Sequence, residues 1–102
     1  MSLTSSISQD GNTLTICLGE RFDFSSHEQF RGAYKEADAK NIAISIDFSK
    51  TEYIDSAALG MLLVLRERAG GDRANITLGS CRTSIQQIMD ISNFAKLFRI
   101  AA

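Results

Sequence analysis

The 102-residue sequence contains no proline and no tryptophan, and it has only two cysteines and one histidine. It has no Pro-, Ser- or Gly-rich stretch that would mark a linker, so we expect a single domain over residues 1–102. Charge of one sign is not in excess: 11 basic and 12 acidic residues leave a formal net charge of −1. Nucleic-acid binding needs a basic stripe, so nucleic acid is not an expected partner.

Long apolar runs are also missing. The longest, such as residues 61–65, are far shorter than the ~20 residues that span a bilayer, and the N-terminus has no signal-peptide pattern. We therefore expect a cytoplasmic protein without membrane insertion. Cys17 and Cys81 have no neighbouring histidine and no metal or redox spacing, which favours reduced thiols. No phosphate-binding glycine loop, no His–acid pair beside a nucleophile and no metal-ligand cluster is evident, so we expect neither an enzyme nor a cofactor or metal site.

The apolar residues that are present follow two periodicities. Alternation predicts strands, and an Asp-Gly-Asn turn at residues 10–12 indicates a hairpin between the first two; the expected strands are 3–8, 13–18, 42–48 and 74–79. Spacings of three and four predict helices over 25–37, capped by Ser25 and Ser26, over 56–69, ending at Gly70-Gly71, and over 82–91. The apolar segment 94–100 fits either a helix or an edge strand.

This order of elements predicts an α/β fold. We expect a mixed sheet of about four or five strands with about three or four helices, and an antiparallel hairpin at the N-terminal edge.

The predicted helix over 56–69 has more apolar surface than one core needs. Ala58, Leu62, Leu65 and Ala69 form the natural core stripe at ~100° per residue. A second stripe contains Ala57, Met61 and Val64, and Leu59 and Leu63 add apolar surface on the other flank. This excess is typical of a partner site, although a helix wedged deeply between other elements gives the same pattern.

Ser56 stands where the chain enters that helix. A serine there usually caps free backbone N–H groups, and Asp55 offers the same chemistry. The partial positive charge of a helix N-terminus also accommodates a phosphate, so phosphorylation of Ser56 need not unfold the domain. The same dianion inside an interface made by Ala57, Met61 and Val64 would expel a partner.

Residues 55–63 (Asp-Ser-Ala-Ala-Leu-Gly-Met-Leu-Leu) resemble the Asp-Ser-Ser/Thr-Gly-Leu-Gly signature of STAS domains, the family of bacterial anti-sigma-factor antagonists. The turn at 19–23, the strand residues 46–48, and the closing segment 88–98 are similar to further features of that family, so the resemblance covers nearly the whole chain. The sequence departs from the family pattern at Ala57 and Ala58, where a hydroxyl residue and glycine are usual, and it has one extra residue in the 19–23 turn.

The resemblance implies that the unphosphorylated protein binds an anti-sigma factor and thereby releases a sigma factor. That anti-sigma factor would be a serine kinase with a histidine-kinase-like ATPase fold that phosphorylates Ser56, and a serine phosphatase would restore the protein. The partner-binding residues implied are Asp23, Asp55, Ser56, Ala57, Ala58, Leu59, Gly60, Met61 and Val64. For Asp23, capping of the first helix remains equally open.

Two alternatives belong to other functional classes. The domain would be a constitutive STAS-like subunit of a larger complex, such as a lipid-transport ATPase or a stress-signalling assembly, if Ser56 were only a cap. A phosphoaspartate receiver would use Asp47 at the end of the central strand, but it needs additional acidic residues for Mg²⁺, and Glu20 alone follows the first long strand.

Overall fold

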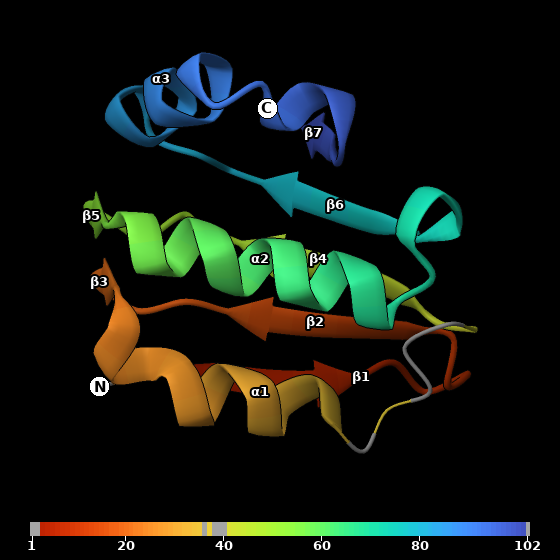
Figure 1. Cartoon of the computed structure of the whole chain (residues 1–102). Coiled ribbons are helices and arrows are strands. Elements are labelled where there is room, and N and C mark those ends of the chain that lie inside the picture. The colour runs from red at the N-terminus through yellow and green to blue at the C-terminus, as the bar shows by residue number, and fades with distance from the viewer. Residues whose placement is uncertain (1–2, 36, 38–40, 102) are drawn as a thin grey trace.

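The protein folds as a five-stranded sheet with helices packed on it (Figure 1). The computed structural model describes residues 3–35, 37 and 41–101. The strands of the main sheet, in spatial order, are β1 (Thr4–Ile7), β2 (Thr13–Cys17), β4 (Ala43–Asp47), β6 (Ile76–Gly79) and β7 (Arg99–Ala101). β1 is antiparallel to β2, and all other neighbours are parallel. The predicted α/β fold with an antiparallel edge hairpin is confirmed.

One face of the sheet carries the hydrophobic core. Alternate residues of β2, β4 and β6 are buried, as the period of two in a strand requires. Two rows of these buried side chains cross the three strands in register: Leu14, Ile44 and Ile76, then Ile16, Ile46 and Leu78. Each is at most 3% exposed. These rows form the floor on which the helices pack.

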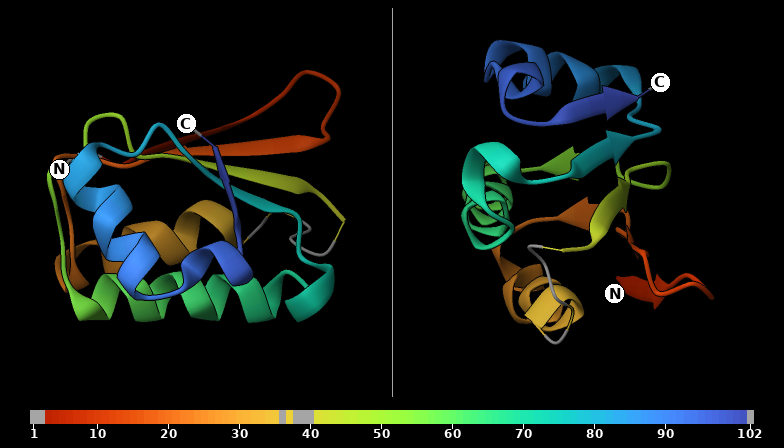
Figure 2. Two further views of the ribbon diagram at one scale, coloured as in Figure 1. Left: turned by 90° about the horizontal axis from the view of Figure 1, so that it is seen from above. Right: turned by 90° about the vertical axis from the view of Figure 1, so that its right-hand side faces the viewer.

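Three α-helices connect the strands in the part of the chain that the structure describes. They are α1 (His27–Lys35), α2 (Ser56–Arg68) and α3 (Thr83–Ile91), with short 3-10 turns η1 (Phe24–Ser26), η2 (Gly71–Arg73) and η3 (Phe94–Lys96). α1 and α2 lie side by side in front of the sheet in Figure 1, and Figure 2 shows that the helices gather on one side of it. α2 ends as predicted, because Gly70 adopts a left-handed conformation with φ of 111°. No helix among the described residues is long and apolar enough to cross a membrane.

The start of the first helix differs from the prediction. Ser25 and Ser26 are not its caps: they lie inside η1, whose N-cap is Asp23, and α1 begins only at His27. Ser26 is buried. The helix ends at Lys35, so Ala37 packs against the core from outside the helix.

A second sheet was not predicted. β3 (Arg21–Phe22) and β5 (Tyr53–Ile54) pair in parallel just beyond the ends of β2 and β4. The loops that lead into them are joined by hydrogen bonds from the Thr51 hydroxyl to the Gly19 carbonyl (2.9 Å) and from the Glu52 N–H to the Glu20 carbonyl (2.8 Å). Two-residue strands carry too little periodicity to predict from sequence. The ambiguous segment 94–100 contains both structures, a 3-10 turn followed by β7.

Candidate partner-docking site

The N-terminus of α2 is built by two adjacent residues with different roles. Asp55 is the N-cap: its backbone is extended, and its carboxylate accepts a hydrogen bond from the Ala58 N–H at 2.8 Å. Ser56 is the first residue of the helix, is exposed, and has no hydrogen bond from its hydroxyl within the described chain. Of the two caps that the sequence offered, the structure uses Asp55. Ser56 is therefore exposed and is not the cap of the helix.

The turn that contains Asp23 lies beside this helix start. β3 and β5 pair with Phe22 opposite Ile54, so the chain passes on one side to Asp23 and on the other to Asp55. The Asp23 carboxylate accepts hydrogen bonds from the hydroxyl and the N–H of Ser25 and pairs with the Arg21 guanidinium at 3.4 Å. The Ser25 hydroxyl lowers the pKa of Asp23, with Arg21 adding a smaller effect. Asp23 is thus a turn cap, and contact with a partner stays a prediction.

Two exposed aromatic side chains flank this end of the molecule. Phe24 is 67% exposed and stacks on His27, with ring centroids 5.5 Å apart. Tyr53 is 43% exposed and is covered on one side by the Arg21 guanidinium, 4.2 Å from the ring centroid. Exposed aromatic and arginine side chains are enriched at protein interfaces. Neither aromatic was among the predicted site residues, because exposure outside a periodic segment depends on tertiary packing.

The remaining predicted partner residues on α2 differ in how far their side chains are exposed. Ala57, Leu59 and Gly60 are half-buried, and Val64 is 52% exposed. Met61 is 7% exposed and Ala58 is fully buried. Ala58 belongs to the core stripe, so its side chain is not on the surface that the resemblance assigned to it. Leu63, on the flank, is 39% exposed, so α2 has apolar surface that the described fold does not cover.

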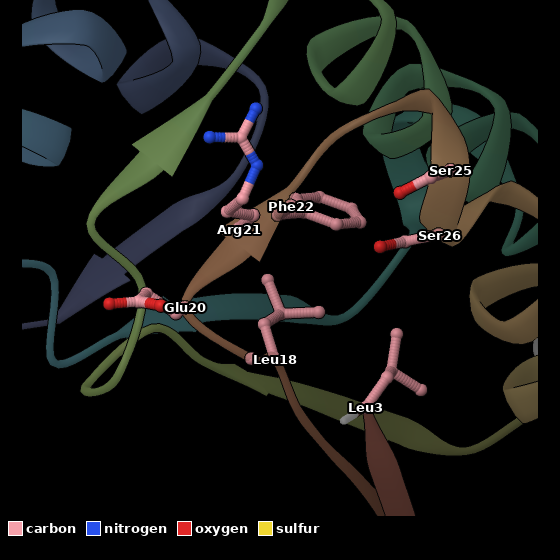
Figure 3. Close-up of a pocket in the computed structure, with 8 residues that line it drawn as sticks. Leu3, Leu18, Glu20, Arg21, Phe22, Ser25 and Ser26 are labelled. Atoms are coloured by element: carbon pink, nitrogen blue, oxygen red, sulfur yellow. The ribbon is translucent and has the colours of Figure 1, made fainter. Parts of the chain in front are cut away.

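A small pocket lies behind this site. It has a volume of about 250 Å³, and Figure 3 shows Leu3, Leu18 and Phe22 around it, with Ser25 and Ser26 on one side. The Arg21 side chain points away from these residues in the same view, toward Tyr53. Pockets for drug-sized ligands usually measure about 300–1,000 Å³. This pocket is smaller and shallow, and its Ser25 hydroxyl is already engaged by Asp23.

The residues considered for other chemistry have contacts of their own at the ends of β2 and β4. The Asp47 carboxylate at the end of β4 accepts a hydrogen bond from the Ser49 N–H (2.8 Å) and lies 3.9 Å from the Cys17 sulfur. Both cysteines are unpaired thiols and half-buried. Burial raises the pKa of the Cys81 thiol. In the part of the chain that the structure describes, no three His, Cys, Asp or Glu side chains are grouped to hold a metal ion.

Comparison with solved structures shows the same architecture in anti-sigma-factor antagonists. The unphosphorylated form of the antagonist SpoIIAA superposes with a TM-score of 0.80 at 16% identity, covering 99% of this chain and 89% of that one. The phosphorylated form of the Bacillus cell fate determinant SpoIIAA gives 0.74 at 16% identity, covering 99% and 92%. At this identity the likeness shows the fold.

Sequence comparison shows the family. The family model described as "Mlab, STAS domain" matches residues 5–99. A STAS-domain containing protein of Pseudomonas aeruginosa (strain UCBPP-PA14) is 44% identical over 101 residues, which cover 99% of this chain and 100% of that protein. The receiver alternative is therefore set aside, and this chain belongs to the STAS domain family.

Proposed function

We propose that this protein is an anti-sigma-factor antagonist that binds an anti-sigma factor while Ser56 is unmodified and releases it when Ser56 is phosphorylated. The observation that carries the proposal is the division of roles at the start of α2. Asp55 caps the helix, and Ser56 is exposed, with no hydrogen bond from its hydroxyl to any residue that the structure describes. A serine kept only for capping would make the hydrogen bond that Asp55 makes here.

The surroundings of Ser56 explain how a phosphate would act. The helix N-terminus stabilises an added dianion, so α2 would remain folded. Asp55 precedes Ser56 directly and Asp23 lies on the neighbouring turn, so the phosphate would add to an existing negative patch. Arg21 already pairs with Asp23 and covers Tyr53. The expected effect is a change in surface charge that repels the partner without a change of fold.

The proposed mechanism and the family support one class of partner. The partner would be an anti-sigma factor with a serine-kinase ATPase fold, and a serine phosphatase would remove the phosphate. SpoIIAA, an anti-sigma-factor antagonist with solved structures in unphosphorylated and phosphorylated forms, supports a phosphate cycle on this fold. The same cycle on this chain is part of the proposal.

The test compares three baits in lysate from the native host. Ser56→Ala and Ser56→Asp differ in the charge at the start of α2, and Ser84→Asp places the same charge on the exposed first turn of α3 as a matched control. We expect Ser56→Ala and Ser84→Asp to recover an anti-sigma factor of the ATPase type and Ser56→Asp to recover about tenfold less or none. Mass spectrometry of the wild-type protein, incubated with that partner and ATP, should locate phosphate on Ser56.

A second function is favoured by one observation. The matching family model is described by the name Mlab, and α2 presents apolar side chains, Leu63 and Val64, whose exposure does not depend on a phosphate. In this alternative the protein is a constitutive STAS subunit of a larger complex, such as a lipid-transport ATPase. Equal recovery of one partner by all three baits, with no phosphorylated form of the native protein, would reject the switch and support the constitutive subunit.

A further inference from the structure

A groove runs between α1 and α2, separate from the Ser56 end. Its volume is about 210 Å³, and the side chains that line it are His27, Phe30, Arg31, Tyr34, Met61, Val64 and Arg68. Phe30, Tyr34 and Met61 form a floor that is at most 7% exposed, and Val64 rises beside it at 52%. Val64 is eight residues from Ser56, or about 12 Å along the helix axis at ~1.5 Å per residue. A partner group in this groove would not touch the serine itself.

The charges on the rim are all of one sign. Arg31 from α1 and Arg68 from α2 line the groove, and neither guanidinium pairs with a carboxylate of the described residues. The acidic side chains near the end of α2 are engaged elsewhere, because Glu67 and Asp72 both pair with Arg66. Burial raises the pKa of Tyr34, and the nearby charges of Arg68 and Arg31 act against that rise.

The size and composition of the groove indicate which kind of partner segment can bind there. It is smaller than the about 300–1,000 Å³ usual for a drug-sized ligand, so it fits one or two inserted side chains. Grooves between two helices with an apolar floor commonly receive the apolar face of an amphipathic helix. The arginines on opposite walls, which pair with no carboxylate among the described residues, call for carboxylates on both sides of that face, since arginine binds carboxylates in a bidentate manner.

We propose that the groove between α1 and α2 binds an acidic amphipathic helix of a partner protein. The helix places a large apolar side chain against Phe30, Met61 and Val64, and Asp or Glu side chains beside it pair with Arg31 and Arg68. The proposal goes beyond the phosphorylation switch, because it rests on the groove alone and requires no modification of Ser56.

The test is photo-crosslinking in the native host. A benzoyl-phenylalanine replaces Val64 in the groove or, as a control, Gln29, which is exposed on α1 outside the groove lining. Both carry Ser56→Ala, so that the proposed switch stays in one state. We expect a crosslink from position 64 to a peptide that has apolar residues at helical spacing flanked by Asp or Glu, and none from position 29.

Charge reversal makes the test specific. Arg31→Glu with Arg68→Glu should reduce the crosslink at least about tenfold. The matched control, Arg73→Glu with Lys96→Glu, changes net charge equally at exposed sites away from the groove and should leave the crosslink intact. Circular dichroism would verify that both variants are folded.

Four results would overturn the proposal: no crosslink above the Gln29 control, a crosslinked peptide without acidic residues, a crosslink to a second copy of this chain, or a yield unchanged by the groove charge reversal. Recovery of a partner by the Ser56→Ala bait together with any of these would reject the groove while leaving the proposed switch intact.

Discussion

The inner and outer faces of α2 have nearly the same apolar composition and opposite surroundings. On the inner face, Ala58, Leu62 and Leu65 are 0% exposed and pack on the sheet. On the outer face, Leu63 and Val64 are 39% and 52% exposed. The fold therefore requires only part of the apolar surface that the sequence provides. The outer part is only partly covered by the described chain, which is what a helix that serves both a core and a partner should show.

Alanine substitution of two neighbouring leucines, one on each face of α2, should give the largest difference in stability. Leu62→Ala should lower the free energy of unfolding by about 2–5 kcal/mol, because it leaves a cavity in the core. Leu63→Ala makes the same chemical change on the same helix. It should change the free energy of unfolding by less than about 0.5 kcal/mol, as substitutions at exposed positions usually do. Urea unfolding followed by circular dichroism measures both. The same Leu63→Ala variant should bind the partner more weakly if the outer face is an interface.

Equal destabilisation by the two leucine substitutions would contradict the comparison. It would mean that the outer face is also buried in solution. Repeating the unfolding at several protein concentrations would then show whether a second copy covers Leu63, because a dimer's stability rises with concentration.

The second prediction distinguishes the roles of Asp55 and Ser56 at the start of α2. Asp55→Ala removes the hydrogen bond to the Ala58 N–H and should lower the free energy of unfolding by about 0.5–2 kcal/mol. Ser56→Ala removes no hydrogen bond of the described structure and should change it by less than about 0.5 kcal/mol. Thermal and urea unfolding of the two variants would check this. If Ser56→Ala were the more destabilising change, the serine would be a cap and its availability for modification would lose support.

Much of α2 and the central strand could be predicted from sequence. The alternation of Ile44 and Ile46 identifies β4, and the apolar stripe with Gly70 after it identifies the length of α2. These signals are local, since each rests on the side chains of one element. The β3–β5 pair could not be predicted, because its two-residue strands are held together by a contact between segments about 30 residues apart in the chain.

The candidate site could also be predicted only in part, because some of its features depend on tertiary contacts. Ser56 was predicted from its place before a helix and from the family resemblance, but the choice between Ser56 and Asp55 as cap depends on backbone geometry. Phe24 and Tyr53 were missed because their exposure is decided by tertiary packing. The groove joins Arg31 to Arg68 across two helices, and no sequence spacing indicates that these arginines share a rim.

The smallest effect is expected at Asp23, which lies on the turn beside the start of α2. Its pKa is lowered below 3.8, first by the Ser25 hydroxyl, so its folded-state pKa lies below its unfolded value. The stability it contributes is therefore complete above pH 3.8 and is lost as pH falls through the lower, folded pKa.

Ser25→Ala should raise the pKa of Asp23 toward 3.8, and carboxyl chemical shifts titrated by NMR from pH 2 to 6 would measure it. Ser84→Ala, on α3, should leave that pKa unchanged. A pKa of Asp23 that stays equally low in Ser25→Ala would show that Arg21, not the hydroxyl, holds the carboxylate. The charge next to Ser56 would then depend on the same guanidinium that covers Tyr53.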